Sequence, residues 1–442
     1  MKVKIKKNWL VIMIYLIASI IFLVPVLEYG ADKRAVGGFC IGLLIVILTR
    51  RKFFSILCYF LITLFNIHMS YVPIGSGNMT VLGMIKIVII IAFIFLIIKS
   101  NGFKKYLLNR NILYYFIWCM ACIIIYVINA LYFKSGLGDM LFRLVPVYFS
   151  IYILINTYEN KAIVNELIIA IIVAAIIYTA VAYIEFIQGK TFFYSSWTGM
   201  ERYRRGILRV GSTLEDANIL ALFLLQPIFI LMMNKTRDLF GKLLSKILII
   251  LMIVILCITS SRASVISLVV GIVLIFILNK KSIKQLLLII FGIIGIMCVP
   301  FIINSLNTYE AASAGQRFYL IAKGITLWKS NFLFGIGLTE FQKQTSWLTM
   351  CEYIRQLCEA GIFAFIIYCA FFIFLIWIYY KNNKYLKQEE LFDASCILGL
   401  IVAFMINSIS LDTFFYYIMW TFPALMFYSL NLCKNDITKV KD

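Results

Sequence analysis

Four arginines fall within eight residues in the segment Arg202–Asn218, which reads RYRRGILRVGSTLEDAN. Two adjacent carboxylates, Glu215 and Asp216, follow them, and apolar runs of membrane length flank the segment on both sides. Arginine stays protonated in a partly dry site and binds phosphate oxygens through paired hydrogen bonds. The residue types and their spacing therefore predict a site for a phosphate-bearing substrate between two membrane spans. The four arginines are Arg202, Arg204, Arg205 and Arg209.

Two further arginines stand at predicted outer ends of helices. Arg262 begins an apolar run with no acidic neighbour, and Arg317 opens a segment with helical periodicity. Each arginine taken alone can equally be an interfacial residue that contacts lipid headgroups. As a set they are better explained by substrate binding, because they gather on the side of the membrane where positive charge is disfavoured. The candidates for diphosphate binding are Arg205, Arg209, Arg262 and Arg317.

Carboxylates at the same predicted mouths of spans complete the candidate chemistry. Asp216 and Glu359 can orient or deprotonate a sugar hydroxyl, so we expect a catalytic set of Arg209, Arg317, Asp216 and Glu359. Asp216 equally suits the N-cap of the following helix, with Asn218 just inside it. Glu185 lies late in an apolar run, and ionisable groups inside a membrane are functional suspects by default.

Several other chemistries are excluded by what the sequence lacks. The chain has a single histidine, His68, so histidine-based metal sites and Ser-His-Asp triads are excluded. It has no D-x-D pair and no G-x-x-x-x-G-K-[ST] loop, and we expect neither a metal nor a cofactor. The net charge of +21 does not indicate nucleic-acid binding, because the basic residues lie between spans rather than on one soluble face.

The elements that position these residues are membrane helices. The chain is 63% hydrophobic and 14% charged, and its apolar runs are continuous rather than alternating, which excludes a transmembrane barrel. We expect an all-α, polytopic bundle of about 12–14 spans that forms a single integral membrane domain over residues 1–442. The candidate spans are 9–28, 35–49, 53–72, 79–98, 112–133, 141–157, 163–187, 216–234, 243–259, 263–278, 284–304, 360–379, 391–409 and 412–431.

Positive charge assigns the connections to two sides of the membrane. With both termini in the cytoplasm, 25 basic residues lie on the cytoplasmic side and 15 on the other, and Lys86 falls inside a span. Ten of those 15 lie in two long outer loops, predicted at residues 188–215 and 305–359. In the second loop, Phe318, Ile321, Ile325 and Trp328 share one helical face, which predicts an amphipathic interfacial helix on the outer leaflet or over the bundle.

The layout resembles the O-antigen polymerase/ligase superfamily, and four short motifs over roughly residues 200–365 carry the resemblance. RVGSTLEDAN (209–218) is similar to an arginine-glycine element that opens a span, and SSRAS (260–264) to a Ser-Arg element at the next outer turn. Arg317 with Trp328 and NFLFGIG (331–337) resemble an outer-loop element, and EAGIFAF (359–365) resembles the Glu-x-Gly that starts the following span. Each motif is degenerate, and it is their order and spacing that make the resemblance specific.

The resemblance implies a Wzy-type polymerase, a metal-independent glycosyltransferase of the bacterial cytoplasmic membrane. Such an enzyme joins undecaprenyl-diphosphate-linked oligosaccharide repeats into O-antigen or capsular polysaccharide on the outer face, with arginines stabilising the diphosphate leaving group. Ligases of the superfamily carry a histidine about nine residues before the Glu-x-Gly, where this chain has Met350 and Cys351. Under this interpretation, Arg209→Ala and Arg317→Ala are expected to express normally and to abolish polymer.

Two alternatives remain open at the level of sequence. One is an O-antigen-type ligase, and the other is a flippase or transporter of the same lipid-linked glycan. The absence of an internal repeat and the outer position of the long loops favour an enzyme over a transporter. The expected partners are the lipid-linked oligosaccharide, membrane lipid, a chain-length regulator and a flippase, with no nucleic acid.

Overall fold

The computed structural model describes residues 71–74, 77–80, 109–133, parts of 144–158, 161–191, 203–204, 207–214, 216–279, 309–347, 349–414 and 416–432. This part of the chain is helical apart from two small antiparallel sheets of two strands each, which confirms the predicted all-α bundle. Within it, three helices are long and apolar enough to cross a membrane, and one bent helix pair adds a fourth if it forms a single span. The chain is therefore a multi-pass membrane protein.

Two compact units make up the chain, each assembled from separate stretches. The first unit contains residues 1–100, 156–262 and 433–442, and the second contains residues 101–155 and 263–432. Each unit is described by itself below. The expectation of one integral domain over residues 1–442 stays a prediction.

The first unit is built around α9 (Ala217–Met232), which packs against α8 (Lys161–Gln188) and α11 (Lys242–Ile258). Nearly every α9 side chain is buried, as its uniformly apolar sequence requires of a central helix. After Met233 the chain turns by 88° into α10 (Asn234–Phe240), a short basic helix that ends at Gly241 with a φ of +88°. The polar composition of α10 keeps it out of the apolar bundle.

Short strands and a 3-10 turn shape the connections of the first unit. β1 (Tyr71–Ile74) pairs with β2 (Gly77–Thr80), and β3 (Tyr203–Arg204) pairs with β4 (Ile207–Leu208). The β3–β4 hairpin is followed by η2 (Ser212–Leu214), which leads into α9. The arginine-rich segment is therefore partly a hairpin rather than an irregular loop.

The second unit packs α17 (Gly361–Asn382) against α6 (Arg110–Tyr132), α18 (Gln388–Asn407) and α19 (Tyr417–Ser429). Trp118 of α6 donates through its indole N–H to the Ile367 carbonyl oxygen at 2.7 Å and packs its ring on Phe371. From Ala263 onward, α12 (Arg262–Leu278) also belongs to this unit. Its Gly271 carbonyl approaches α18 at Gly399, where a β-carbon would stand only 2.8 Å from that oxygen.

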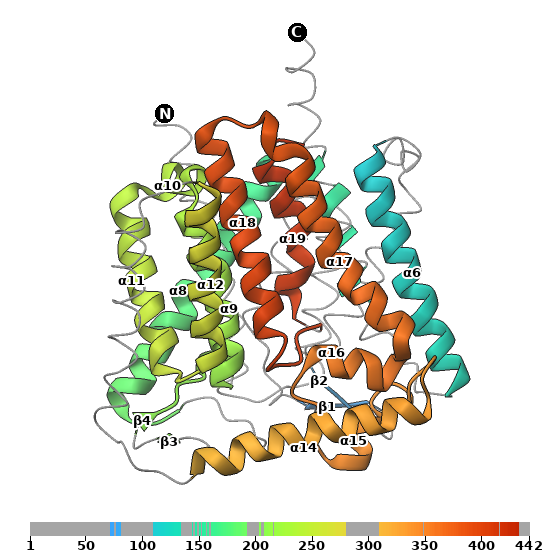
Figure 1. Cartoon of the computed structure of the whole chain (residues 1–442). Helices are drawn as coiled ribbons and strands as arrows, with labels where there is room; N and C mark the ends of the chain where they lie inside the picture. The colour runs from blue at the N-terminus through green and yellow to red at the C-terminus, as the bar shows by residue number, and fades with distance from the viewer. Residues whose placement is uncertain are drawn as a thin grey trace. The chain divides into compact units, whose positions relative to one another are not determined.

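Several further elements lie together at one end of α6 and α17 (Figure 1). They are α14 (Tyr309–Ser330), α15 (Glu340–Thr345), α16 (Glu352–Arg355) and the π-helical turn η3 (Gln356–Ala360), whereas η4 (Asn383–Tyr385) lies in the connection at the other end of α17. That opposite connection carries Lys381, Lys384 and Lys387. The two ends of α17 thus separate the predicted outer loop from a predicted cytoplasmic connection.

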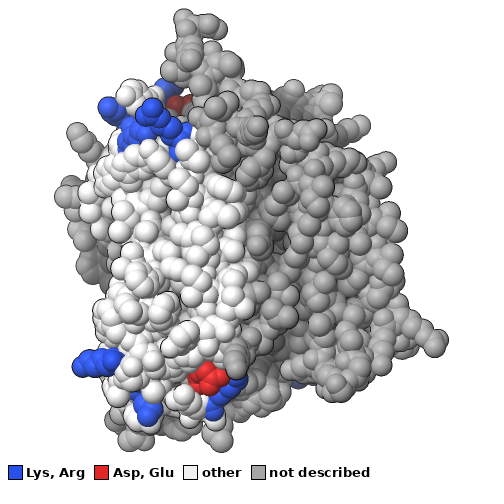
Figure 2. Space-filling view, turned by 90° about the vertical axis from the view of Figure 1, so that its right-hand side faces the viewer, with Lys and Arg blue, Asp and Glu red and all other residues white. Residues whose placement is uncertain are grey.

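The surface between these ends is uncharged. Figure 2 shows that the described part of this face is broad and uncharged between an upper and a lower rim that both carry charged residues. Exposed apolar side chains of α6 and α17, among them Ile117, Ile124, Ile366 and Ile373, account for such a face. Large exposed apolar surfaces on a helix bundle are expected where lipid is the solvent.

Eight predicted spans correspond to helices of the described chain, within about five residues at each boundary. They are 112–133, 163–187, 216–234, 243–259, 263–278, 360–379, 391–409 and 412–431. The predicted ends at 72 and 79 overrun into β1 and β2, because a hairpin rather than helix closes that connection. Spans 9–28, 35–49 and 284–304 lie outside the described residues, as do the bodies of 53–72 and 79–98 and part of 141–157.

Candidate functional site

Arg209 is buried in the first unit, where it joins two of the predicted motifs. Its side chain is 8% exposed, and its Nε donates to the Thr259 carbonyl oxygen at 3.1 Å. A second guanidinium nitrogen donates to Asn218 Oδ1 at 3.0 Å. Because Thr259 directly precedes the SSRAS turn, Arg209 ties the segment 209–218 to that turn. At least part of its hydrogen-bonding capacity therefore holds the fold together.

The turn between β4 and α9 is held by a carboxylate from α8. Glu185 is fully buried, and its Oε2 accepts a hydrogen bond from the Ser212 backbone N–H at 2.9 Å. Ser212 has a φ of +54°, a left-handed conformation that is uncommon for a residue with a side chain. Glu185, which the sequence suggested as a functional residue because it is ionisable and lies in an apolar run, thus fixes the loop that follows Arg209.

Asp216 is the N-cap of α9. Its Oδ1 accepts hydrogen bonds from the backbone N–H groups of Asn218 at 2.6 Å and Ile219 at 3.1 Å. The structural alternative for Asp216 is therefore confirmed, while its catalytic role stays a prediction.

The remaining predicted residues of this region are only partly described. Arg262 is exposed at the first position of α12, three residues after Thr259. Arg205 and Glu215 lie outside the described residues.

Two glycine motifs of the second unit pack directly on each other. The Ile336 and Gly337 N–H groups donate to the Cys358 and Glu359 carbonyl oxygens at 2.8 and 3.1 Å. Gly335 and Gly361 have φ values of +68° and +82°, and a β-carbon on either would collide with the facing backbone. The glycines are therefore required by close backbone approach rather than by a ligand.

Asn129 of α6 fastens this pair of motifs from the side. Its Nδ2 donates to the Phe334 carbonyl oxygen at 2.6 Å and to the Glu359 carbonyl oxygen at 3.1 Å. Asn129 is 1% exposed, so these bonds form in a dry environment, where an unmade bond is costly. The position of the Glu359 backbone is thus determined by three elements of the second unit.

The predicted interfacial helix is α14, which packs over α16 and η3. One close approach is at Gly324, where a β-carbon would lie 2.6 Å from Ile354 Cγ2. The buried face runs through Leu320 and Gly324, whereas Phe318 is 73% exposed. The predicted apolar stripe lies beside this buried face, with Ile321, Ile325 and Trp328 half-buried, and its contact with the outer leaflet stays a prediction.

Arg317 lies on α14 seven residues before Gly324, and hence on roughly the same face and about 10 Å away along the axis. It is partly exposed and makes no ion pair with a described carboxylate. Arg317 and Glu359 belong to the second unit, whereas Arg209, Asp216 and Arg262 belong to the first.

A buried charged chain surrounds Glu359. Arg355 Nε donates to Glu359 Oε2 at 3.2 Å, and Arg355 Nη1 lies 3.8 Å from Asp412 Oδ2. The Asp412 Oδ1 atom accepts a hydrogen bond from Thr349 Oγ1 at 2.8 Å. Asp412 lies in the connection between α18 and α19, where burial raises the pKa of its carboxyl and the Arg355 guanidinium offsets part of the rise. This buried charged chain thus connects Thr349 with Asp412, which are 63 positions apart in sequence.

Glu352 clamps the same connection in place. Its Oε2 accepts from the Thr413 and Phe414 N–H groups at 2.6 and 2.9 Å, and its Oε1 accepts from Gln356 Nε2 at 2.6 Å. Its own backbone N–H donates to the Ser408 carbonyl oxygen. Sequence reasoning missed Arg355, Glu352 and Asp412 as site residues. The available signal was three charged residues, Glu352, Arg355 and Glu359, spaced at i, i+3 and i+7 on one helical face.

A comparison with protein-family models identifies the region that contains Glu352, Arg355 and Glu359. Residues 247–369 match the O-antigen ligase family. The match confirms the predicted resemblance to the O-antigen polymerase/ligase superfamily and indicates a membrane glycosyltransferase-like enzyme that acts in O-antigen-related glycan synthesis. Such an enzyme acts on lipid-linked oligosaccharides. No curated protein matches the chain.

The O-antigen ligase match contains Arg262, Arg317, Arg355 and Glu359, and it ends before Asp412. Arg209 and Asp216 precede it. Glu359 and Arg355 therefore belong to the matched region. Asp412, the other carboxylate that faces Arg355, comes from a later part of the sequence.

Cys351, within the O-antigen ligase match, is buried next to this cluster. It is 5% exposed, and burial raises the pKa of its thiol above the ordinary value. Met350 before it has a φ of +57°, so the backbone turns sharply into α16. A buried thiol with a raised pKa stays protonated at neutral pH and is a poor proton acceptor.

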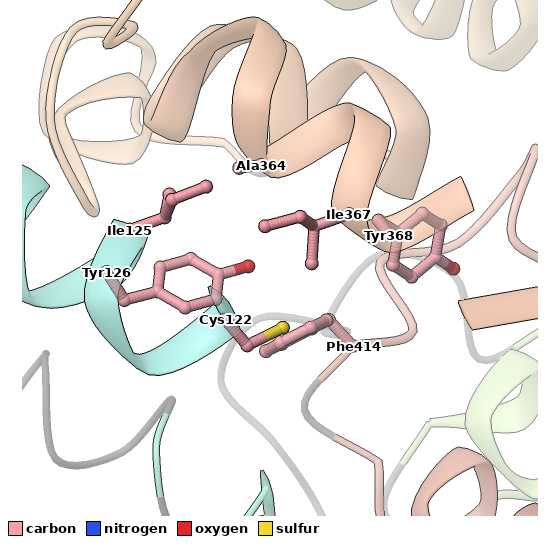
Figure 3. A pocket seen from close by; sticks show the side chains of 7 residues that line it. All are labelled: Cys122, Ile125, Tyr126, Ala364, Ile367, Tyr368 and Phe414. Carbon is pink, nitrogen blue, oxygen red and sulfur yellow. The ribbon is translucent and has the colours of Figure 1, made fainter. Parts of the chain in front are cut away.

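A narrow gap lies between α6 and α17, next to Gln356 of η3 (Figure 3). Its walls are apolar apart from the two tyrosine hydroxyls, and Tyr126 donates its hydroxyl hydrogen to Gln356 Oε1 at 2.6 Å. A sugar or diphosphate needs several polar partners, which this gap lacks. The lining side chains belong to Cys122, Ile125, Tyr126, Ala364, Ile367, Tyr368 and Phe414.

Proposed function

We propose that the protein is a polymerase of lipid-linked oligosaccharide repeat units, of the kind that makes O-antigen or capsular-type polysaccharide. It works on the outer face of the bacterial cytoplasmic membrane, with both termini in the cytoplasm. The donor is the growing glycan on undecaprenyl diphosphate, and the acceptor is a second lipid-linked repeat.

The reaction is a displacement at the anomeric carbon of the donor. A hydroxyl oxygen of the acceptor forms the new glycosidic bond, and the bond from the anomeric carbon to the diphosphate oxygen breaks. Undecaprenyl diphosphate leaves with the electron pair, and the hydroxyl proton passes to a carboxylate. Charge develops on the diphosphate, and Arg317, Arg262, Arg205 and Arg209 are assigned to stabilise it.

Between the two predicted carboxylates, the geometry favours Glu359 for the acceptor. Asp216 Oδ1 is occupied by two backbone N–H groups of its own helix. Glu359 instead lies beside Arg355, which favours the ionised carboxylate that can accept a proton. This makes Glu359 the better candidate for the group that orients or deprotonates the acceptor hydroxyl.

The observation that carries the polymerase over the ligase is the buried Cys351. Ligases that the chain resembles carry a histidine in this neighbourhood, and imidazole is the usual proton acceptor at neutral pH. This protein has Met350 and Cys351 in that neighbourhood, and neither a thioether nor a buried, protonated thiol readily accepts a proton. The second candidate remains an O-antigen-type ligase, which the description of the matched family favours.

The test uses purified protein with a synthetic undecaprenyl-diphosphate-linked repeat, a chelator and no nucleotide. A ladder of multiples of the repeat is expected. If the protein instead transfers finished glycan to an acceptor that is not a repeat unit, the ligase is correct. If it moves labelled repeat across a proteoliposome membrane without forming any new bond, the transporter is correct.

A further inference from the structure

One carboxylate oxygen of the buried charged chain has no donor. Asp412 is 5% exposed, and its Oδ2 makes no hydrogen bond. The guanidinium of Arg355 lies nearest in the ion pair at 3.8 Å, which is beyond hydrogen-bonding distance. Buried carboxylate oxygens are nearly always satisfied, so an exception calls for an explanation.

The surroundings of Asp412 are otherwise well ordered. Thr349 holds Oδ1, and Glu352 binds the two N–H groups that follow Asp412 in the chain. The backbone and one oxygen are thus fixed, while the second oxygen faces the Arg355 guanidinium in an ion pair without a hydrogen bond. A site that is rigid except for one missing hydrogen-bond donor is preorganised to receive that donor from a ligand.

The geometry points to Asp412 as a binding residue for the acceptor: its Oδ2 accepts a hydrogen bond from a sugar hydroxyl, and Arg355 positions it together with Glu359. This inference rests on the proposed function and extends it to a residue outside the matched family segment. The ligand class is a neutral hydroxyl donor, because a diphosphate oxygen cannot donate and would be repelled by the carboxylate.

Arg355 is the positioning residue of this arrangement. Its Nε holds Glu359 and its Nη1 faces Asp412, so one guanidinium fixes the separation of two carboxylates. Glu359 and Asp412 come from segments far apart in sequence, and this cation, Thr349 and Glu352 are among the residues that join them. An acceptor that bridges the two carboxylates can be aligned by both at once, which is the contribution of orientation to catalysis.

The experiment measures binding of the donor repeat and of the acceptor repeat separately, by blocking each substrate from taking the other role. The donor repeat has hydrogen in place of its accepting hydroxyl, and the acceptor repeat carries a lipid joined by a linkage that cannot be cleaved. Each pair gives one dimer, and the KM of each substrate is measured separately. Wild type is compared with Asp412→Asn, which preserves the size and the bond from Thr349 but replaces the Oδ2 acceptor by an N–H donor. Glu389→Gln, an exposed carboxylate of α18, is the matched control.

We expect Asp412→Asn to raise the KM of the acceptor by roughly tenfold or more, the effect of losing one hydrogen bond to a charged group. The KM of the donor should stay at the level of the control, and the variant should be at least as thermally stable as wild type at neutral pH, because it cannot carry the buried charge. Thr349→Val, which releases Oδ1, should raise the acceptor KM by a smaller factor.

Three outcomes would overturn the inference. An acceptor KM that matches the Glu389→Gln control means that Asp412 Oδ2 does not bind the acceptor. An equal rise in both KM values, or a loss of folded protein, means that Asp412 has a structural role. If wild type forms no dimer at all, the proposed function itself fails, and that result is distinct from a wild-type dimer that Asp412→Asn leaves unchanged.

Discussion

Gly361 and Leu333 approach so closely that a β-carbon on Gly361 would overlap the Leu333 carbonyl oxygen. Next to this contact, Ile362 donates its N–H to the Phe332 carbonyl oxygen at 3.1 Å. The two glycine motifs that carried the family resemblance are therefore two sides of one backbone junction. This junction sets the start of α17 and the position of Glu359.

Alanine at Gly361 should prevent this junction from forming. The substitution adds strain at a φ of +82°, about 1–2 kcal/mol, to a clash with backbone that cannot move aside. We expect a large loss of monodisperse protein in detergent and a lower apparent Tm. Gly315→Ala is the control, since its β-carbon would meet no atom within 4 Å on the exposed side of α14. It should be neutral or stabilising by up to about 1 kcal/mol. Equal yields of the two variants would rule out the structural role of Gly361.

Removing Arg355 should destabilise the protein far more than removing a surface cation. Arg355→Ala leaves Glu359 and Asp412 buried without the guanidinium, a change that typically costs about 3–5 kcal/mol. Lys343→Ala breaks the exposed pair with Glu340, where the side chains are 62% and 35% exposed, and should cost about 0–1 kcal/mol. Urea or thermal unfolding of both variants in the same detergent provides the comparison. A similar shift for the two would show that the buried pair contributes no more than a surface pair.

Arg209 and Arg317 should respond differently to alanine. Arg317 is partly exposed, so Arg317→Ala is expected to unfold like wild type and to form no polymer. Arg209→Ala loses hydrogen bonds to Thr259 and Asn218 and should cost about 1–3 kcal/mol as well as activity. The structure thus revises the expectation of normal expression for Arg209→Ala. A polymer ladder from Arg317→Ala at the wild-type level would remove Arg317 from the proposed site.

The sequence was sufficient for the helices because membrane length and hydropathy dominate their energetics. The start of α9 was predicted from Asp216 and Asn218, and the cap hydrogen bonds confirm it. The order of motifs also led to the correct superfamily. These are local signals, which a single chain carries without any knowledge of its tertiary contacts.

The charged chain around Glu359 could not be predicted in the same way. Asp412 and Thr349 are 63 residues apart, and nothing in either segment indicates the other. The buried face of α14 at Leu320 and Gly324 was likewise not predicted, because hydrophobicity alone does not reveal that a glycine, Gly324, packs closely on Ile354. Long-range pairing and close backbone approach depend on the fold, which periodicity does not encode.

The raised pKa of Asp412 predicts a pH-dependent cost to stability. Because the carboxyl binds its proton more tightly in the folded state than in the unfolded state, ionisation favours unfolding. The penalty is absent below the unfolded pKa, near 4, and develops as pH rises through the folded pKa, at about 1.4 kcal/mol for each unit of difference. Asp412→Asn cannot ionise and should escape it. The apparent Tm of Asp412→Asn minus that of wild type should therefore increase between about pH 4 and pH 7. A difference that falls with pH would mean that Arg355 stabilises ionised Asp412 by more than burial destabilises it.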